Sequence, residues 1–154
     1  MFLFFAGCSS NKKVEKKFDN QAEKLVQALE TKDSELFKSL LSNNALNTED
    51  LDAGIDYCFD LIGDKQFMVK KLGCPIYDEF DSGKHKKWIE ASYLINVTEK
   101  ETYFLDFSFW IVNDCDKNTL GINNLKISEY TLGNYISAIE YEKNGIYNPE
   151  WDME

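Results

Sequence analysis

Arginine is absent from this chain: all 17 basic residues are lysine, and they stand against 27 aspartates and glutamates for a formal net charge of −10. Nucleic-acid binding relies on basic patches and on the bidentate guanidinium group of Arg, so this balance argues against that function class. The sequence also lacks an apolar run of the ~20 residues that a membrane-spanning helix requires. We therefore expect neither a nucleic-acid partner nor a membrane-spanning segment.

Side chains that bind metals or act as nucleophiles are also scarce. The chain has one His and four Cys, with no CxxC pair and no Cys/His cluster, which argues against a zinc site. It contains no Gly-rich phosphate loop and no arrangement of Ser, His and Asp typical of hydrolases. We expect no metal and no cofactor, and a non-enzymatic role is favoured.

Apolar and aromatic residues, by contrast, are plentiful. Hydrophobic residues make up 44% and aromatic residues 14% of the 154 positions. This composition is too apolar for a disordered chain, and the length suits one domain with its own core.

The N-terminal residues change abruptly from apolar to polar. Met-Phe-Leu-Phe-Phe-Ala-Gly-Cys is followed by Ser-Ser-Asn-Lys-Lys, and an apolar stretch that ends in small residues is typical of a secretory signal. Within it, Ala6-Gly7-Cys8 resembles the lipobox of bacterial lipoproteins. The resemblance implies that Cys8 is acylated and becomes the first mature residue. We expect 1–8 to be the end of this signal, 9–16 a polar tether and 17–154 a single domain.

A lipid anchor implies an extracytoplasmic protein held at the cell membrane. Five Lys and three acids fall in residues 1–24, whereas 12 Lys and 24 acids follow, so the acidity belongs to the displayed domain. Outside the anchor, Cys58, Cys74 and Cys115 remain. One disulfide with a free thiol is an option in that compartment. Cys58 lies on an apolar helical stripe, which favours a buried thiol.

Hydrophobic periodicity predicts three helices in the first half of the chain, at 14–30, 33–42 and 48–63. Asp33 and Thr48 are the expected N-caps of the second and third helices. Asn43-Asn44 is expected to end the second helix, and Gly63 the third.

After Gly63 the apolar residues recur with a period of two, which predicts strands. The alternation is weak at 66–72 and clear in the segments 87–98, 102–113 and 122–130. Asp81-Ser82-Gly83-Lys84 is a turn signal, and 134–142 fits either a strand or a short helix. Helices followed by antiparallel strands predict an α+β fold, with the helices packed on one face of a curved, mainly antiparallel sheet.

The stretch from Ala22 to Ser42 combines a long helix, a Lys32-Asp33 break and a short helix containing Leu-Phe-Lys-Ser. It resembles the opening of the superfamily that contains nuclear transport factor two, ketosteroid isomerase and the SnoaL-like proteins. The resemblance covers about residues 14–142 and implies a cone-shaped fold with the helices in its concave side. With the lipobox, the chain resembles an uncharacterised family of short bacterial lipoproteins with a domain of unknown function.

Alternation separates two faces of the predicted sheet. The all-apolar face is expected to meet the helices, and a pocket there would be lined by Tyr93, Tyr103 and Phe107. The opposite face carries Trp88, Phe104 and Trp110 among polar residues, and aromatic residues in such company suit a contact surface. Either a second copy in a homodimer or the C-terminal tail, with Tyr141, Tyr147 and Trp151, would cover that face.

Carboxylates provide the catalytic alternative. In the isomerase relatives an Asp inside the cone acts as a base, and Asp106 lies in the middle of an aromatic strand. Its parity places it on the face away from the helices, so the resemblance does not carry that role over. An isomerase or dehydratase that uses an inward carboxylate, Asp106 or Glu129, is the alternative function.

The other polar residues fit solvent-exposed positions better than metal-binding or catalytic sites. Asp114, Asp116 and Asn118 have the spacing that starts a calcium loop, but Thr119 and Leu125 replace its Gly and Glu. The acids at every fourth position of the third helix, Asp52, Asp56 and Asp60, suit a solvated helix face. His85 lies among lysines beside a turn, with no acid placed by the sequence to orient it.

The sequence therefore predicts a lipid-anchored binding module for a small apolar ligand or a protein partner. The enzyme described above is one alternative. An acidic, immunity-type inhibitor of a basic toxin is another, because the folded body carries the negative charge.

Overall fold

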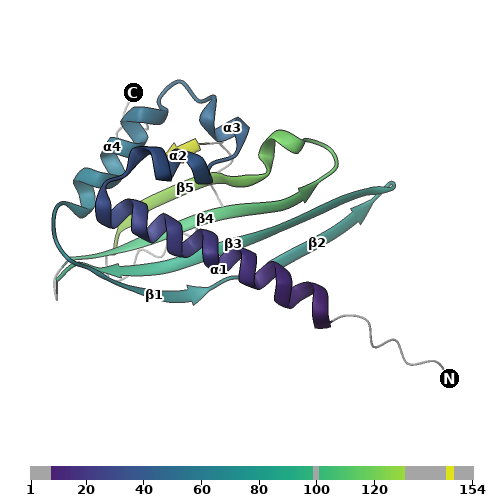
Figure 1. Ribbon diagram of the computed structural model, residues 1–154, viewed down its shortest axis with the longest axis horizontal. Helices are drawn as coiled ribbons and strands as arrows, with labels where there is room; N and C mark the ends of the chain where they lie inside the picture. Colours follow the sequence, from purple (N-terminus) through teal and green to yellow (C-terminus); the bar gives the residue numbers. More distant parts are fainter. Residues whose placement is uncertain (1–7, 99–100, 131–144, 148–154) are drawn as a thin grey trace.

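A computed structural model describes residues 8–98, 101–130 and 145–147 (Figure 1). Its helices are α1 (Cys8–Thr31), α2 (Ser34–Leu40), α3 (Asn43–Leu46), α4 (Leu51–Ile62) and the 3₁₀ helix η1 (Lys117–Thr119). Its strands are β1 (Met68–Gly73), β2 (Ile76–Asp81), β3 (Lys84–Asn96), β4 (Thr102–Asn113), β5 (Gly121–Glu129) and β6 (Gly145–Tyr147). The predicted α+β class is confirmed. Residues 134–142 lie outside the described ranges.

The helices form where the apolar period predicts them. Phe18, Ala22, Leu25 and Leu29 are buried along one side of α1. This helix begins at Cys8, so the residues expected to form a tether are helical. Asp33 caps α2 as predicted, since its carboxylate accepts a hydrogen bond from the Leu36 amide at 2.9 Å. Gly63, with φ of 69°, follows the last residue of α4 as predicted.

The segment between α2 and α4 differs from the prediction. Asn43-Asn44 does not lead into a loop but opens α3, because the Ser42 hydroxyl accepts a hydrogen bond from the Ala45 amide at 3.1 Å. Thr48 is not the cap of α4: its hydroxyl donates to the Ala45 carbonyl at 2.8 Å, and α4 begins after Asp50. The Ser42 amide also donates to the Ile122 carbonyl of β5 at 2.8 Å, so the tertiary fold holds this segment on the sheet.

The six strands form one open, mixed sheet with the order β1-β3-β4-β5-β6, and β2 also pairs with β3. Strands β1 to β5 pair antiparallel, whereas β6 runs parallel to β5. Because β4 occupies one side of β3, strands β1 and β2 share the other side. The predicted turn at Asp81–Lys84 is confirmed: Ser82 and Gly83 both have positive φ, as a two-residue hairpin turn requires.

The helices cover one face of this sheet, and the core lies between the two layers (Figure 1). The Phe18 ring of α1 lies 5.9 Å from the Phe107 ring and 6.0 Å from the Phe109 ring of β4. The predicted parity of β4 is therefore confirmed, because its odd-numbered residues face the helices. Asp106 pairs with Ser92 and Lys126 on the other face.

Candidate functional site

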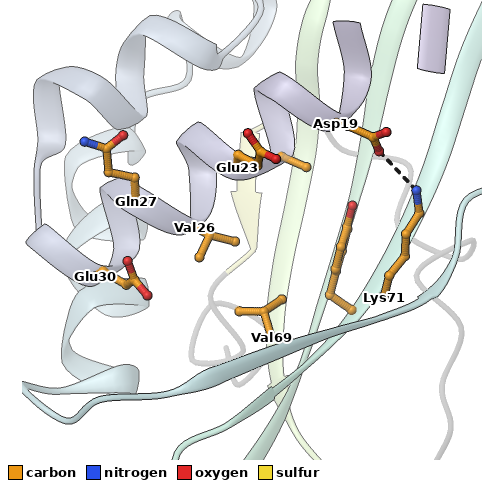
Figure 2. Close-up of a pocket in the computed structure, with 9 residues that line it drawn as sticks. Asp19, Glu23, Val26, Gln27, Glu30, Val69 and Lys71 are labelled. Carbon is orange, nitrogen blue, oxygen red and sulfur yellow. Dashed lines mark hydrogen bonds and ion pairs between the residues drawn. The ribbon is translucent and has the colours of Figure 1, made fainter. Parts of the chain in front are cut away.

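A groove of about 440 Å³ lies between α1, β1 and β3 (Figure 2). We call it the α1–β1 groove; its lining comprises Asp19, Ala22, Glu23, Val26, Gln27, Glu30, Val69, Lys71 and Tyr93. Six of these come from α1, where spacings of three and four residues place them on one helix face. Val69 and Lys71 pair with Ile95 and Tyr93, so they lie on the helix-facing side of β1.

One end of the groove is closed by an ion pair. Lys71 Nζ lies 3.2 Å from Asp19 Oδ1 (Figure 2). It also lies 5.2 Å from the centre of the Phe18 ring. Partial burial is the largest single influence and acts to lower the pKa of Lys71, but the hydrogen bonds and charges of Asp19 and Cys74 together outweigh it and the pKa is raised. Lys71 therefore stays protonated and balances Asp19.

The other carboxylates of the groove have no such counterion. Glu23 and Glu30 are exposed on α1, and neither forms an ion pair with another residue that the structure describes. Between them Val26 points toward Val69 of β1 (Figure 2). The groove thus combines an apolar centre with a negatively charged rim.

Tyr93 forms the buried wall of the groove. Its ring stacks on Phe107 with centroids 6.0 Å apart, and burial raises the pKa of its hydroxyl. The hydroxyl is hydrogen-bonded to Cys74, whose own pKa is raised by burial although Lys71 acts against this. Tyr93 is therefore a neutral hydrogen-bonding group at neutral pH.

Of the three predicted pocket residues, Tyr93 lines the groove, whereas Tyr103 and Phe107 do not. Phe107 is buried beneath it, between Tyr93 and Phe18. Tyr103 is buried too, and burial together with the charge of Glu101 raises its pKa. Both face the helices as expected, but the close packing of the core leaves them no free surface toward the groove.

The aromatic residues of the other sheet face stack on one another. The Trp88 ring lies 4.9 Å from the Tyr77 ring and 4.9 Å from the Trp110 ring, and Phe104 lies 5.2 Å from Tyr130. Trp88 and Trp110 are half-buried and Phe104 is buried. Tyr141, Trp151 and the side chain of Tyr147 lie outside the described part of the chain, so homodimer and tail both stay predictions for the cover of this face.

The carboxylates considered for catalysis do not reach the groove. Asp106 is 4% exposed on the face away from the helices, where it accepts a hydrogen bond from Ser92 Oγ at 2.5 Å. Burial raises its pKa, while Ser92 and Lys126 act against this. Glu129 is exposed at the end of β5. The alternative that uses an inward carboxylate at either position has no support from this geometry.

His85 has an orienting acid, contrary to the sequence analysis. Asp78 Oδ1 lies 2.7 Å from His85 Nε2, and Asp78 Oδ2 accepts from Lys87 Nζ at 2.6 Å. These two contacts, that of Lys87 first, lower the pKa of Asp78. The prediction missed Asp78 because β2 shows no clear alternation, and its pairing with β3 brings residues 78 and 85 together.

The remaining polar candidates have structural partners. Asp114 accepts a hydrogen bond from the His85 amide at 2.9 Å, and Asp116 accepts from Asn44 at 2.8 Å. Asp52, Asp56 and Asp60 are exposed on α4, and Asp52 pairs with Lys38 at 2.8 Å. Among the residues described, no group of three or more His, Cys, Asp or Glu side chains is placed to hold a metal ion.

The cysteines of the domain are free thiols. Cys58 is buried on α4, as its apolar stripe predicts, and burial raises its pKa to about 12. Cys74 is half-buried and Cys115 exposed. Across the described ranges, no helix is both long and apolar enough to cross a membrane.

Most residues of the groove were not identified from the sequence. One feature of the sequence did point to the α1 side of the groove: polar residues recur with helical spacing along that helix, at Asp19, Glu23, Gln27 and Glu30. Acids on a helix surface usually face water, however, and nothing in the sequence placed Val69 and Lys71 opposite them.

Comparison with known proteins identifies the family. No curated protein sequence matches the chain. Residues 24–138 match the family described as Domain of unknown function (DUF5104), which spans the groove residues from Val26 to Tyr93. With most of its length matched, this chain belongs to the DUF5104 family.

Proposed function

We propose that this chain is the extracytoplasmic domain of a lipid-anchored protein and that it binds a small ligand in the α1–β1 groove. The observation that carries the proposal is the groove itself, a hollow of about 440 Å³ on the helix side of the sheet. Small-molecule sites typically measure ~300–1,000 Å³ and combine an apolar lining with a few polar groups. The α1–β1 groove has this make-up, with Val26 and Val69 at its centre.

The titratable groups of the groove also support binding without catalysis. Its titratable groups are a paired lysine, a neutral tyrosine and carboxylates on an exposed helix face. No carboxylate there is buried next to a second catalytic group, as acid–base chemistry in the isomerase relatives would require. Binding is therefore the favoured role.

The anchor forms the second part of the proposal. Ala6-Gly7-Cys8 supports acylation of Cys8, and Cys8 is also the first residue of α1. The cone-shaped superfamily fold is proposed on the same footing, supported by the α+β class and by helices on one sheet face. Mass spectrometry of the chain purified from bacterial membranes tests the anchor: Cys8 should carry diacylglycerol, and a Cys8→Ser variant should appear unmodified in the soluble fraction.

Filling the groove tests the binding site. In Val26→Trp, the indole ring occupies the space between α1 and β1, whereas Lys24→Trp adds the same ring to the exposed side of α1 outside the groove. A panel of octylamine, octanol and octanoate is titrated while thermal unfolding is followed. At least one probe should raise the Tm of the wild type and of Lys24→Trp but not of Val26→Trp. Equal responses in all three proteins would contradict the proposed site.

A further inference from the structure

We propose that the ligand of the α1–β1 groove is a linear aliphatic diamine, an alkyl chain with an ammonium group at each end. This inference rests on the proposed function and specifies its ligand. It follows from three features of the groove: the sign of its charge, the spacing of its free carboxylates and the apolar surface between them.

The charge of the groove favours a cation. Three carboxylates line it, from Asp19, Glu23 and Glu30, against the single ammonium group of Lys71. Lys71 is committed to Asp19 at 3.2 Å, which leaves the charges of Glu23 and Glu30 without a counterion among the described residues. A carboxylate or phosphate ligand would meet like charge, whereas an ammonium group would meet complementary charge.

The spacing of these glutamates favours two ammonium groups. Glu23 and Glu30 are seven residues apart on α1, and an α-helix rises 1.5 Å per residue, so the carboxylates are about 10 Å apart along the helix axis. Seven residues also correspond to almost two full turns, which places both on the same side of the helix. A single small cation cannot contact both carboxylates at that separation, but the two ends of one extended molecule can.

The surface between the glutamates favours methylene groups over polar ones. Val26 lies between Glu23 and Glu30, with Val69 facing it from β1 (Figure 2). Ala22, one helical turn before Val26, also lines the groove. An alkyl chain laid along this strip would remove apolar surface from water, on both the chain and the protein. Gln27 and the Tyr93 hydroxyl add neutral hydrogen-bonding groups that do not oppose a cation.

The groove is open, which sets the size of the expected effects. Ion pairs between exposed groups contribute ~0–1 kcal/mol, so each glutamate should account for no more than about a fivefold change in affinity. Such contributions are screened by salt. Binding should therefore weaken measurably between 20 mM and 500 mM NaCl.

The experiment is an NMR or calorimetric titration of the folded domain with defined probes. Octamethylenediamine should bind more tightly than octylamine, octylamine more tightly than octanol, and octanoate most weakly. Among diamines, octamethylenediamine should bind more tightly than putrescine, because its longer alkyl chain covers more of the apolar strip between the two carboxylates. The double variant Glu23→Gln/Glu30→Gln should lose about five- to 25-fold in diamine affinity while octanol binding stays the same.

The control is Glu15→Gln/Glu49→Gln, which makes the same change in net charge at two exposed glutamates outside the groove. It should bind octamethylenediamine like the wild type. Octanol or octanoate binding as tightly as the diamine, in a manner that Val26→Trp abolishes, would overturn the diamine assignment and leave the proposed site standing. Absence of binding by every probe would overturn both.

Discussion

Lys71 of β1 and Asp19 of α1 join the edge of the sheet to the long helix, with 3.2 Å between Nζ and Oδ1. The Lys71 ammonium group also lies over the Phe18 ring, 5.2 Å from its centre, so the same residue contacts the core and closes the groove. This one contact relates the stability of the α1–β1 interface to the shape of the proposed binding site.

Replacing Lys71 by Met should have a small effect on stability. Met places an unbranched apolar side chain of similar length beside Phe18, and an ion pair with both side chains about half exposed contributes no more than ~1 kcal/mol. Urea unfolding of Lys71→Met should therefore lie within about 1 kcal/mol of the wild type. Lys70→Met, on the neighbouring exposed residue of β1, is the control, and a much larger loss in Lys71→Met alone would contradict this account.

Asp106 should make the domain less stable as pH rises. Its folded-state pKa is raised by burial, so the folded chain holds this proton more tightly than the unfolded chain does. Stability then falls as pH increases from the ordinary carboxyl pKa of ~4 through the folded pKa. Asp106→Asn keeps an acceptor for Ser92 and removes the charge, so it should unfold at higher urea than the wild type at pH 7. The difference should shrink toward pH 4, and a constant difference would contradict the assignment.

Asp78 should have the opposite pH dependence. Its folded-state pKa is lowered by Lys87 and then by His85, so its contribution is present above the ordinary carboxyl pKa and is lost as pH falls through the folded pKa. Asp78→Asn would leave the ammonium group of Lys87, a residue that is only 8% exposed, without its carboxylate. A loss of ~1–3 kcal/mol is expected at pH 7. Glu79→Gln, an exposed neighbour, should lose far less in the same urea titration.

Gly54 should resist replacement by Ala although it lies inside α4. Ala is favoured over Gly by ~1 kcal/mol in a helix interior, but a Cβ at this position would lie 2.9 Å from Ile146 Cβ of β6. We expect Gly54→Ala to destabilise the domain by ~1–3 kcal/mol through overpacking. The adjacent residue Ala53 is exposed and provides the contrast. Ala53→Gly should lower the free energy of unfolding only by the ~1 kcal/mol difference in helix propensity. A stabilised Gly54→Ala variant in thermal unfolding would show that α4 and β6 pack less closely.

Local patterns were sufficient to predict most elements of the fold. The apolar period of α1 and the alternation along β4 are properties of neighbouring residues, and both are confirmed, down to Phe107 facing the helices and Asp106 facing away. The short segments were harder. Helix α3 has only one turn, and the Thr48 hydroxyl donates back to the Ala45 carbonyl of that turn, so the cap predicted at Thr48 was wrong.

The amino-acid sequence by itself determined the α+β class, the buried faces and the acidity of this chain, because helix period, strand alternation and charge are encoded residue by residue. Tertiary structure alone decided which of these faces meet. It brought Val69 and Lys71 opposite Glu23 and Glu30, placed Asp78 against His85 and pressed Gly54 onto Ile146. These contacts join residues far apart in the chain or on separate strands. They depend on strand register and on packing between layers, which local periodicity does not specify.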